Sequence, residues 1–113
     1  MLSQANRLKK KKDFDRIFKK GKGLKGGFLF VKAVRNDLTC SRFGFVVGQK
    51  VSKKATVRNT LKRKLRTLVQ ERLPQIRQGL DIVIVVLGAT AKQDAVVLGE
   101  MIDNIFKKAK LFL

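Results

Sequence analysis

The side chains with the clearest chemistry lie in the stretch RNTLKRKLR, residues 58–66. Arg58, Lys62 and Arg66 are spaced i, i+4 and i+8, so on a helix they line up over roughly 12 Å. Like charges at this spacing repel one another and destabilise an isolated helix. Guanidinium and ammonium groups bind phosphates, and arginine can do so through two hydrogen bonds at once. The spacing therefore predicts a surface that holds a polyanion.

The same helix has a second, apolar side. Asn59 and Arg63 lie next to the row of cations, and the leucines and valines occupy the neighbouring side of the helix. A charged row is more often a solvated helix face, but such faces usually carry interleaved acids. Glu71 is the only carboxylate between Asp37 and Asp81, which favours a binding surface. The apolar side consists of Val57, Leu61, Leu65, Leu68 and Val69.

The chain has few side chains that could catalyse a reaction on their own. The chain has no histidine and one cysteine, Cys40, which excludes a histidine-based triad, a zinc site of Cys and His ligands and an internal disulfide. The eight carboxylates are spread along the chain. The closest pair, Asp13 and Asp15, fits the first turn of a helix. The residues thus favour a binding protein over an enzyme in its own right.

The positive charge is large and unevenly distributed. The net charge is +19 over 113 residues, and residues 1–72 carry 22 Lys and Arg against 4 Asp and Glu. A nucleic acid explains this concentration, because phosphate contacts release counterions. An acidic membrane would require a bulky apolar face, and no apolar run approaches the ~20 residues that span a bilayer. The N-terminus lacks the apolar segment of a secretory signal, so we expect a cytoplasmic protein.

Periodicity and turn residues predict the elements that position these side chains. Residues 1–8 are expected to form a flexible basic arm, and a short helix begins near Lys11 with Phe14, Ile17 and Phe18 on one face. A flexible basic turn is expected at residues 21–27. The remaining expected elements are strands at 28–34 and 42–51, a helix that begins between 53 and 57 and ends before Pro74, a strand at 81–87 and a helix at 94–108.

This order, α-β-β-α-β-α, predicts a single α+β domain over residues 1–113, an α-β sandwich with helices laid on one sheet. Phe14 and Phe18 lie on a short helix beside basic residues. Two uses remain open for them, since they can pack in the core or stack against the bases of a single strand.

These motifs resemble the protein subunit of bacterial ribonuclease P. The similarity rests on the Arg-Asn pair in RNTLKRKLR, on RFGFVVGQKVSKKA before it, on the opening NRLKKKKDFDRIFKKG and on the strand DIVIVVLGA. It covers residues 6 to about 106. The resemblance implies a left-handed β-α-β crossover around the basic helix, which general rules disfavour.

The resemblance also implies an activity. In this family a large RNA is the catalyst, and the holoenzyme, an endoribonuclease, removes the 5′ leader from precursor tRNA with Mg²⁺ that is bound chiefly by the RNA. The protein binds the leader and stabilises the RNA, and it is expected to be monomeric without RNA. The residues expected to meet the catalytic RNA are Lys53, Lys54, Arg58, Asn59, Lys62, Arg63 and Arg66. Those expected in the leader cleft are Phe14, Phe18, Val31 and Lys50.

Some positions depart from the family pattern. Thr60 stands where a third basic residue commonly follows Arg-Asn, and Gln49 replaces a common lysine. The strand end VVLGA lacks a frequent arginine. Val31 occupies a position that is aromatic in some members, which implies fewer stacking surfaces in the cleft.

Three other functions are compatible with parts of the pattern. A ribosomal protein that binds folded rRNA is the first alternative, since it shares the charge and a related fold. A metal-dependent nuclease would cleave precursor tRNA without an RNA subunit. A nonspecific DNA-binding protein would prefer duplex DNA to structured RNA at the same salt concentration.

Overall fold

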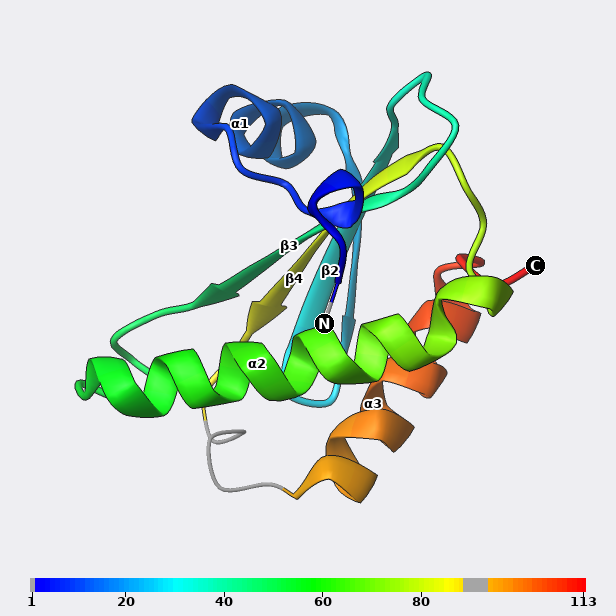
Figure 1. The fold of residues 1–113 in the computed structure, drawn as a ribbon. Helices are drawn as coiled ribbons and strands as arrows, with labels where there is room; N and C mark the ends of the chain where they lie inside the picture. The colour runs from blue at the N-terminus through cyan, green and yellow to red at the C-terminus, as the bar shows by residue number, and fades with distance from the viewer. Residues whose placement is uncertain (1, 89–93) are drawn as a thin grey trace.

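A computed structural model describes residues 2–88 and 94–113, and its core is a four-stranded sheet covered by helices on both faces (Figure 1). The predicted α-β sandwich is confirmed, with one more strand than expected. In chain order the elements are η1 (Gln4–Asn6), α1 (Lys11–Lys20), β1 (Lys22–Gly26), β2 (Leu29–Arg35), β3 (Arg42–Val47), α2 (Ala55–Arg72), η2 (Leu73–Gln75), β4 (Leu80–Val86) and α3 (Ala95–Lys108). No described helix is long and apolar enough to cross a membrane.

Strand β4 is the centre of the molecule. The strand order is β1-β2-β4-β3, and β4 runs antiparallel to β2 and parallel to β3. Ile82, Val83 and Ile84 are fully buried, which confirms that this apolar run is covered on both faces. Side chains alternate between the faces of a strand, so consecutive residues of β4 enter two different cores.

The two cores lie on opposite faces of the sheet. On one face Ile82 and Ile84 pack with Leu61 and Leu65 of α2 in the larger cluster, to which α3 also contributes. On the other face Val83 packs with Ile17 of α1 and with Leu8. The face of the sheet that carries α1 is called the α1 face below. It therefore carries one short helix, whereas the opposite face carries two longer ones.

The connection from β3 through α2 to β4 is a left-handed crossover. In Figure 1 both strands run downwards, α2 lies in front of the sheet, and β4 lies to the right of β3. With the strands pointing up, β4 would lie to the left, which is opposite to the usual hand. The hand implied by the family resemblance is confirmed.

The basic segment 21–27 is not a flexible turn, as the sequence suggested, but contains the edge strand β1. It pairs antiparallel with β2, with Leu24 opposite Val31. Leu24 packs against the larger core, while the two lysines of the strand are exposed. Lysine is a common residue on edge strands because it discourages further pairing. Because the segment is rich in lysine and glycine, its sequence suggested a turn rather than a strand.

The segment expected to be a flexible arm, residues 1–8, is docked over its described part. Leu2 is 2% exposed and Leu8 7%. The backbone N–H of Leu8 donates to the carbonyl of Phe43 at 2.9 Å, and Arg7 forms a bridge with the same residue of β3. Burial of these two leucines, at about 1.5–3 kcal/mol each, explains why the segment docks on the sheet. The charged residues around them gave it the appearance of a flexible arm in the sequence.

Gly44 provides a test of how closely α1 packs on the sheet. A Cβ at this position would lie 2.6 Å from Cζ of Phe14, so we expect Gly44→Ala to destabilise the protein by about 1–3 kcal/mol through overpacking. The measurement is urea denaturation. Gly48→Ala is the control, since a Cβ there meets nothing within 4 Å. Equal stability of the two variants would contradict the close packing of α1 against β3.

Candidate nucleic-acid interface

Helix α2 carries the predicted row of cations beside its apolar side. Leu61, Leu65, Leu68 and Val69 are buried, which fixes the rotation of the helix. Arg58, Lys62 and Arg66 are then half-buried along the edge of the core, whereas Asn59 and Arg63 are exposed. None of the ion pairs among the described residues involves the row. This unpaired positive surface is called the cation stripe below. The cation stripe consists of Arg58, Asn59, Lys62, Arg63 and Arg66.

Arg58 has a structural contact that sequence reasoning did not predict. Its Nη1 donates to the backbone carbonyl of Ser52 at 2.9 Å, and the hydroxyl of Ser52 accepts from the backbone N–H of Lys54 at 3.2 Å. Arg58 thereby holds the turn that leads into α2. Its remaining N–H groups belong to the cation stripe, so this side chain combines a structural contact with a position in that row.

The turn before α2 extends the positive surface. Lys53 and Lys54 are exposed, and no side chain caps the first turn of the helix at Lys54. The N-terminus of a helix carries a partial positive charge and free N–H groups that suit a phosphate. Lys50 is exposed in the turn that follows β3. The three lysines thus lie at the end of the sheet from which α2 departs.

The aromatic residues Phe14 and Phe18 lie on the α1 face but differ in exposure. Phe14 is half-buried and packs with the small cluster of Leu8 and Ile17. Phe18 is 40% exposed. Nζ of Lys32 lies 6.0 Å from the centroid of the Phe18 ring and donates to the Phe18 carbonyl at 2.6 Å. Phe14 therefore serves packing first, while Phe18 offers a ring beside a cation.

Val31 does not lie with Phe14 and Phe18, with which it was expected to line a leader cleft. It is 1% exposed and belongs to the core on the opposite face of the sheet from Phe14 and Phe18. Its neighbours Phe30 and Lys32 lie on the α1 face, because side chains alternate along β2. The ring of Phe30 lies over Gly23, where a Cβ would come within 3 Å of it. The alternation in FLFVKAV, with its single lysine, was the available signal for the correct face.

A buried carboxylate that the sequence analysis did not single out ties α1 to the sheet. Asp81 of β4 is fully buried and accepts two hydrogen bonds from Arg42, from Nε at 2.8 Å and from Nη2 at 2.6 Å. It also accepts from Nη2 of Arg16 at 2.7 Å and from Nδ2 of Asn36 at 2.9 Å. These four residues are called the Asp81 network below.

The Asp81 network keeps its carboxylate ionised. Burial raises the pKa of Asp81, but the hydrogen bonds from Arg42 and Asn36, together with the charge of Arg42, outweigh it and lower the pKa below the ordinary value. The hydrogen bond to Asp81 likewise raises the pKa of Arg42. Buried charges are tolerated when paired and fully hydrogen-bonded, so the network is a rigid junction between α1, β3 and β4.

Comparison with known proteins places this arrangement in a family. The family model described as Ribonuclease P matches residues 2–110. The ribonuclease P protein component of Pseudanabaena sp. is 38% identical over 112 residues, which cover 98% of this chain and 97% of that protein. The corresponding protein of Syntrophomonas wolfei is 36% identical over 112 residues, covering 99% and 93%.

Solved structures agree with the sequence relatives. The structure of the Staphylococcus aureus RNase P protein superposes with a TM-score of 0.88 at 27% identity, covering 97% of this chain and 100% of that one. The RNase P protein from Thermotoga maritima gives a TM-score of 0.82 at 34% identity, covering 90% and 96%.

Proposed function

Because the chain belongs to the ribonuclease P protein family, we propose that it acts by holding two RNAs on two separate surfaces. The family makes it a protein component of ribonuclease P, a bacterial ribonucleoprotein that processes tRNA. In the proposal the cation stripe of α2 binds the catalytic RNA, and the α1 face binds the 5′ leader of precursor tRNA. The observation that carries it is the unpaired cation stripe, which lies on one helix and apart from the aromatic α1 face.

The cation stripe suits a folded RNA. Its arginines can contact phosphates through two hydrogen bonds each. Asn59 is exposed on the same helix and offers both a donor and an acceptor to a base edge or a 2′-hydroxyl. Binding RNA would also relieve the repulsion between like charges at i and i+4. These features support assembly with the RNA subunit as the role of α2.

The α1 face suits a single strand of variable sequence. Phe18 is exposed, Phe30 is half-exposed, and Lys32 lies between β2 and α1 with its ammonium group beside the Phe18 ring. A base that stacks on an aromatic ring gains about 1–3 kcal/mol whatever its identity. A lysine beside the ring can meet the adjoining phosphate. We therefore place the leader here, with Lys50 at the end of the sheet and without Val31.

The hydrolytic step is assigned to the RNA. No three Cys, Asp or Glu side chains come together as a possible metal site anywhere in residues 2–88 and 94–113, so the protein's own residues do not fit the Mg²⁺ that the family implies. When bound by the RNA, Mg²⁺ would supply an activated water. The part left to the protein is to bind and position the two RNAs and to reduce the repulsion between their phosphates.

The family match also bears on the alternatives. A ribosomal protein or a general DNA-binding protein would account for the charge. Neither accounts for the ribonuclease P protein components that match 98% and 99% of this chain. A nuclease acting without RNA would need a cluster of catalytic side chains, and among the described residues no three His, Cys, Asp or Glu side chains gather at one place. The ribonuclease P role explains the charge, the fold and the relatives together.

Phe18→Ala tests the proposed leader site. We expect it to weaken the binding of holoenzyme to precursor tRNA with a leader of eight or more nucleotides by about 5- to 100-fold, because one stacking contact is lost. Binding of the same tRNA with a one-nucleotide leader should not change. The measurement is fluorescence anisotropy in Ca²⁺, which slows cleavage. Phe28→Ala is the control, since Phe28 is equally exposed, at 39%, but lies between β1 and β2. Equal weakening with both leader lengths would contradict this site.

A further inference from the structure

An exposed apolar patch lies on a part of the molecule that neither proposed RNA site uses. Val96 and Val97, in the first turn of α3, are 69% and 36% exposed, and Phe28, in the turn between β1 and β2, is 39% exposed. Met101 joins α3 to this turn, because its Cε lies 3.1 Å from the position of a Cβ at Gly27. This cluster is called the α3 patch below. It consists of Phe28, Val96, Val97 and Met101.

The α3 patch concentrates the exposed apolar side chains of the protein. Six large apolar side chains of the described residues are exposed, and three of the six belong to the patch. Val97 and Met101 stand four positions apart, so they share one side of α3. Single exposed apolar residues are ordinary on a protein surface, whereas a group of them with a polar rim marks an interaction site. The α3 patch is therefore a candidate docking surface.

The charge around the α3 patch is opposite to that of the rest of the protein. Residues 94–106 hold three acids and no Lys or Arg, in a chain whose net charge is +19. Asp94 and Glu100 are exposed, and neither belongs to an ion pair among the described residues. Glu100 follows Val96 by four positions, so the two lie on one side of α3. The patch therefore has a negative rim.

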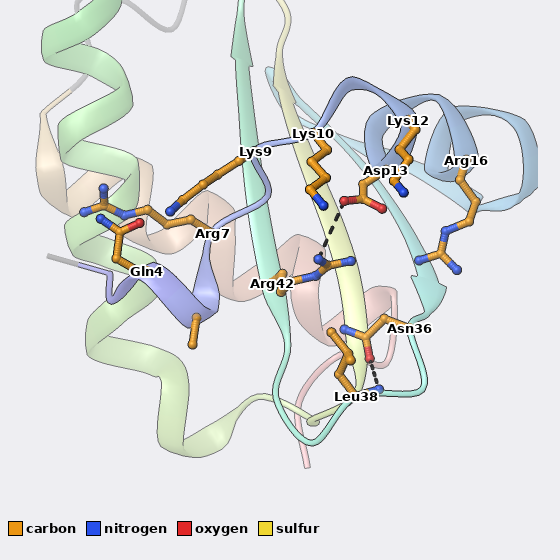
Figure 2. Close-up of a pocket in the computed structure, with 11 residues that line it drawn as sticks. Gln4, Arg7, Lys9, Lys10, Lys12, Asp13, Arg16, Asn36, Leu38 and Arg42 are labelled. Atoms are coloured by element: carbon orange, nitrogen blue, oxygen red, sulfur yellow. Dashed lines mark hydrogen bonds and ion pairs between the residues drawn. The ribbon is translucent and has the colours of Figure 1, made fainter.

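The surface around α1 is the contrast. An open pocket beside the N-terminal end of α1 is lined by six Lys and Arg side chains and by one carboxylate, that of Asp13 (Figure 2). Helices α1 and α3 cover opposite faces of the sheet (Figure 1). With RNA on the cation stripe and on the α1 face, the α3 patch stays uncovered, and its acids repel phosphate groups. A nucleic acid or an acidic membrane is thus a poor match for it.

We propose that the α3 patch docks a partner protein through a basic amphipathic segment, which has apolar side chains on one side and Lys or Arg on the other. The apolar side chains cover the patch, and the cations meet Asp94 and Glu100. Phe28 and Met101 suit this use, because aromatic residues and methionine are enriched in protein interfaces and methionine adapts its shape to a partner. The site lies outside both RNA surfaces, so this inference goes beyond the proposed function.

Charge complementarity favours this occupant over a second copy of the chain. A symmetric contact between two α3 patches would place the same acids of both copies close together, and like charges across an interface are unfavourable. A basic segment instead finds on α3 the opposite charge that the rest of this protein lacks. The commitment is therefore to a basic partner, and self-association becomes an outcome of the test.

The probe is a synthetic helical peptide of leucine and lysine, ~18 residues long, with its leucines on one side. Titrated into the full-length protein without RNA, it should move the NMR signals of the first turn of α3 and of Phe28. A peptide of the same composition with its leucines dispersed around the helix should bind at least about tenfold more weakly. The leucine peptide with glutamate in place of lysine should instead move the signals of the cation stripe.

Two variants with a matched control test the apolar contacts. Val96→Ser/Val97→Ser should weaken binding of the leucine–lysine peptide at least about tenfold, because two apolar contacts are lost. Leu38→Ser/Leu113→Ser also removes two exposed apolar side chains, but these lie together at another site. This control should change the peptide affinity less than about twofold.

A second pair of variants tests the charge. Glu100→Lys should weaken binding of the leucine–lysine peptide about tenfold, because a contact with a lysine becomes a repulsion. Asp15→Lys makes the same change of charge at an exposed position of α1 and should change the affinity less than about twofold. Equal losses in these two variants would mean that the peptide senses only total charge, which would overturn the proposal.

Three further results would also overturn it. One is equal weakening by Val96→Ser/Val97→Ser and by Leu38→Ser/Leu113→Ser. Another is equal binding of the ordered and the dispersed peptides. The third is a dimer of the protein alone in sedimentation that Val96→Ser/Val97→Ser dissociates, which would assign the patch to a second copy. Because these measurements omit RNA, and because Val96→Ser/Val97→Ser should bind ribonuclease P RNA like the wild type, a failed α3 patch and a failed ribonuclease P role are distinguishable.

Discussion

Replacing Asp81 by asparagine is expected to lower the free energy of unfolding by about 3–5 kcal/mol, the usual cost of breaking a buried charge pair from one side. The substitution keeps the shape but leaves Arg16 and Arg42 without their carboxylate. Because small domains are stable by about 5–15 kcal/mol, this is a large share of the total. Urea denaturation at pH 7 measures it.

The effect should depend on pH in a defined direction. The pKa of Asp81 is lowered in the folded protein, so its contribution is fully present above the ordinary carboxyl pKa of about 3.9. It is lost as the pH falls through the lowered value. The difference in stability between wild type and Asp81→Asn should therefore shrink in acid.

Asp103→Asn is the matched control for this experiment. Asp103 pairs with Arg72 at 2.5 Å, but its side chain is 51% exposed. Exposed pairs contribute about 0–1 kcal/mol, so this variant should remain close to wild type. A loss below about 1 kcal/mol for Asp81→Asn, equal to that of the control, would contradict the account of the Asp81 network as a rigid junction.

The second large effect concerns assembly with RNA. Arg63→Ala/Arg66→Ala is expected to weaken binding to ribonuclease P RNA by about 10²-fold near 0.1 M salt, since two charge-assisted contacts of about 1.5 kcal/mol are lost. The slope of log K against log salt should fall by about 0.7–0.9 for each contact. Arg58 is left in place because it holds the turn at Ser52. Filter binding over a range of KCl concentrations measures both quantities.

Thermal unfolding completes this test. Neither substituted side chain forms an ion pair or a hydrogen bond with any part of the chain that the structure describes, so the melting temperature should stay close to wild type. Lys107→Ala/Lys108→Ala removes equal charge from α3 and should weaken RNA binding far less. Equal losses in the two variants would show that RNA senses total charge, and would remove the special role of α2.

The elements with strong apolar patterns could be predicted from the sequence. Strand β4 is a run of β-branched residues, and α2 carries its leucines at helical spacing, so both were predicted close to their observed bounds. Strand β1 was missed because an edge strand need not alternate, and its lysines and glycines are typical of turns. Leu2 and Leu8 were missed because isolated leucines in a charged segment give no periodic signal.

Some features of the candidate site could likewise be predicted from the sequence, and others could not. The cation stripe follows from spacing along one helix, which is local information. The Asp81 network joins residues 39 and 65 positions apart in the chain, and only the folded sheet brings them together. The position of Val31 could have been predicted but was not. Side chains alternate along β2, and this pattern places Lys32 on the α1 face and Val31 in the core on the other face.

Single-turnover cleavage of a precursor tRNA at low Mg²⁺ tests the central claim most directly. Three samples are compared: a bacterial ribonuclease P RNA alone, this protein alone, and the two together. We expect cleavage at the mature 5′ end in the mixture and little or none with either component alone. A mixture no faster than the RNA alone would contradict the proposed role of the cation stripe. Cleavage by the protein alone would contradict the assignment of the chemistry to RNA.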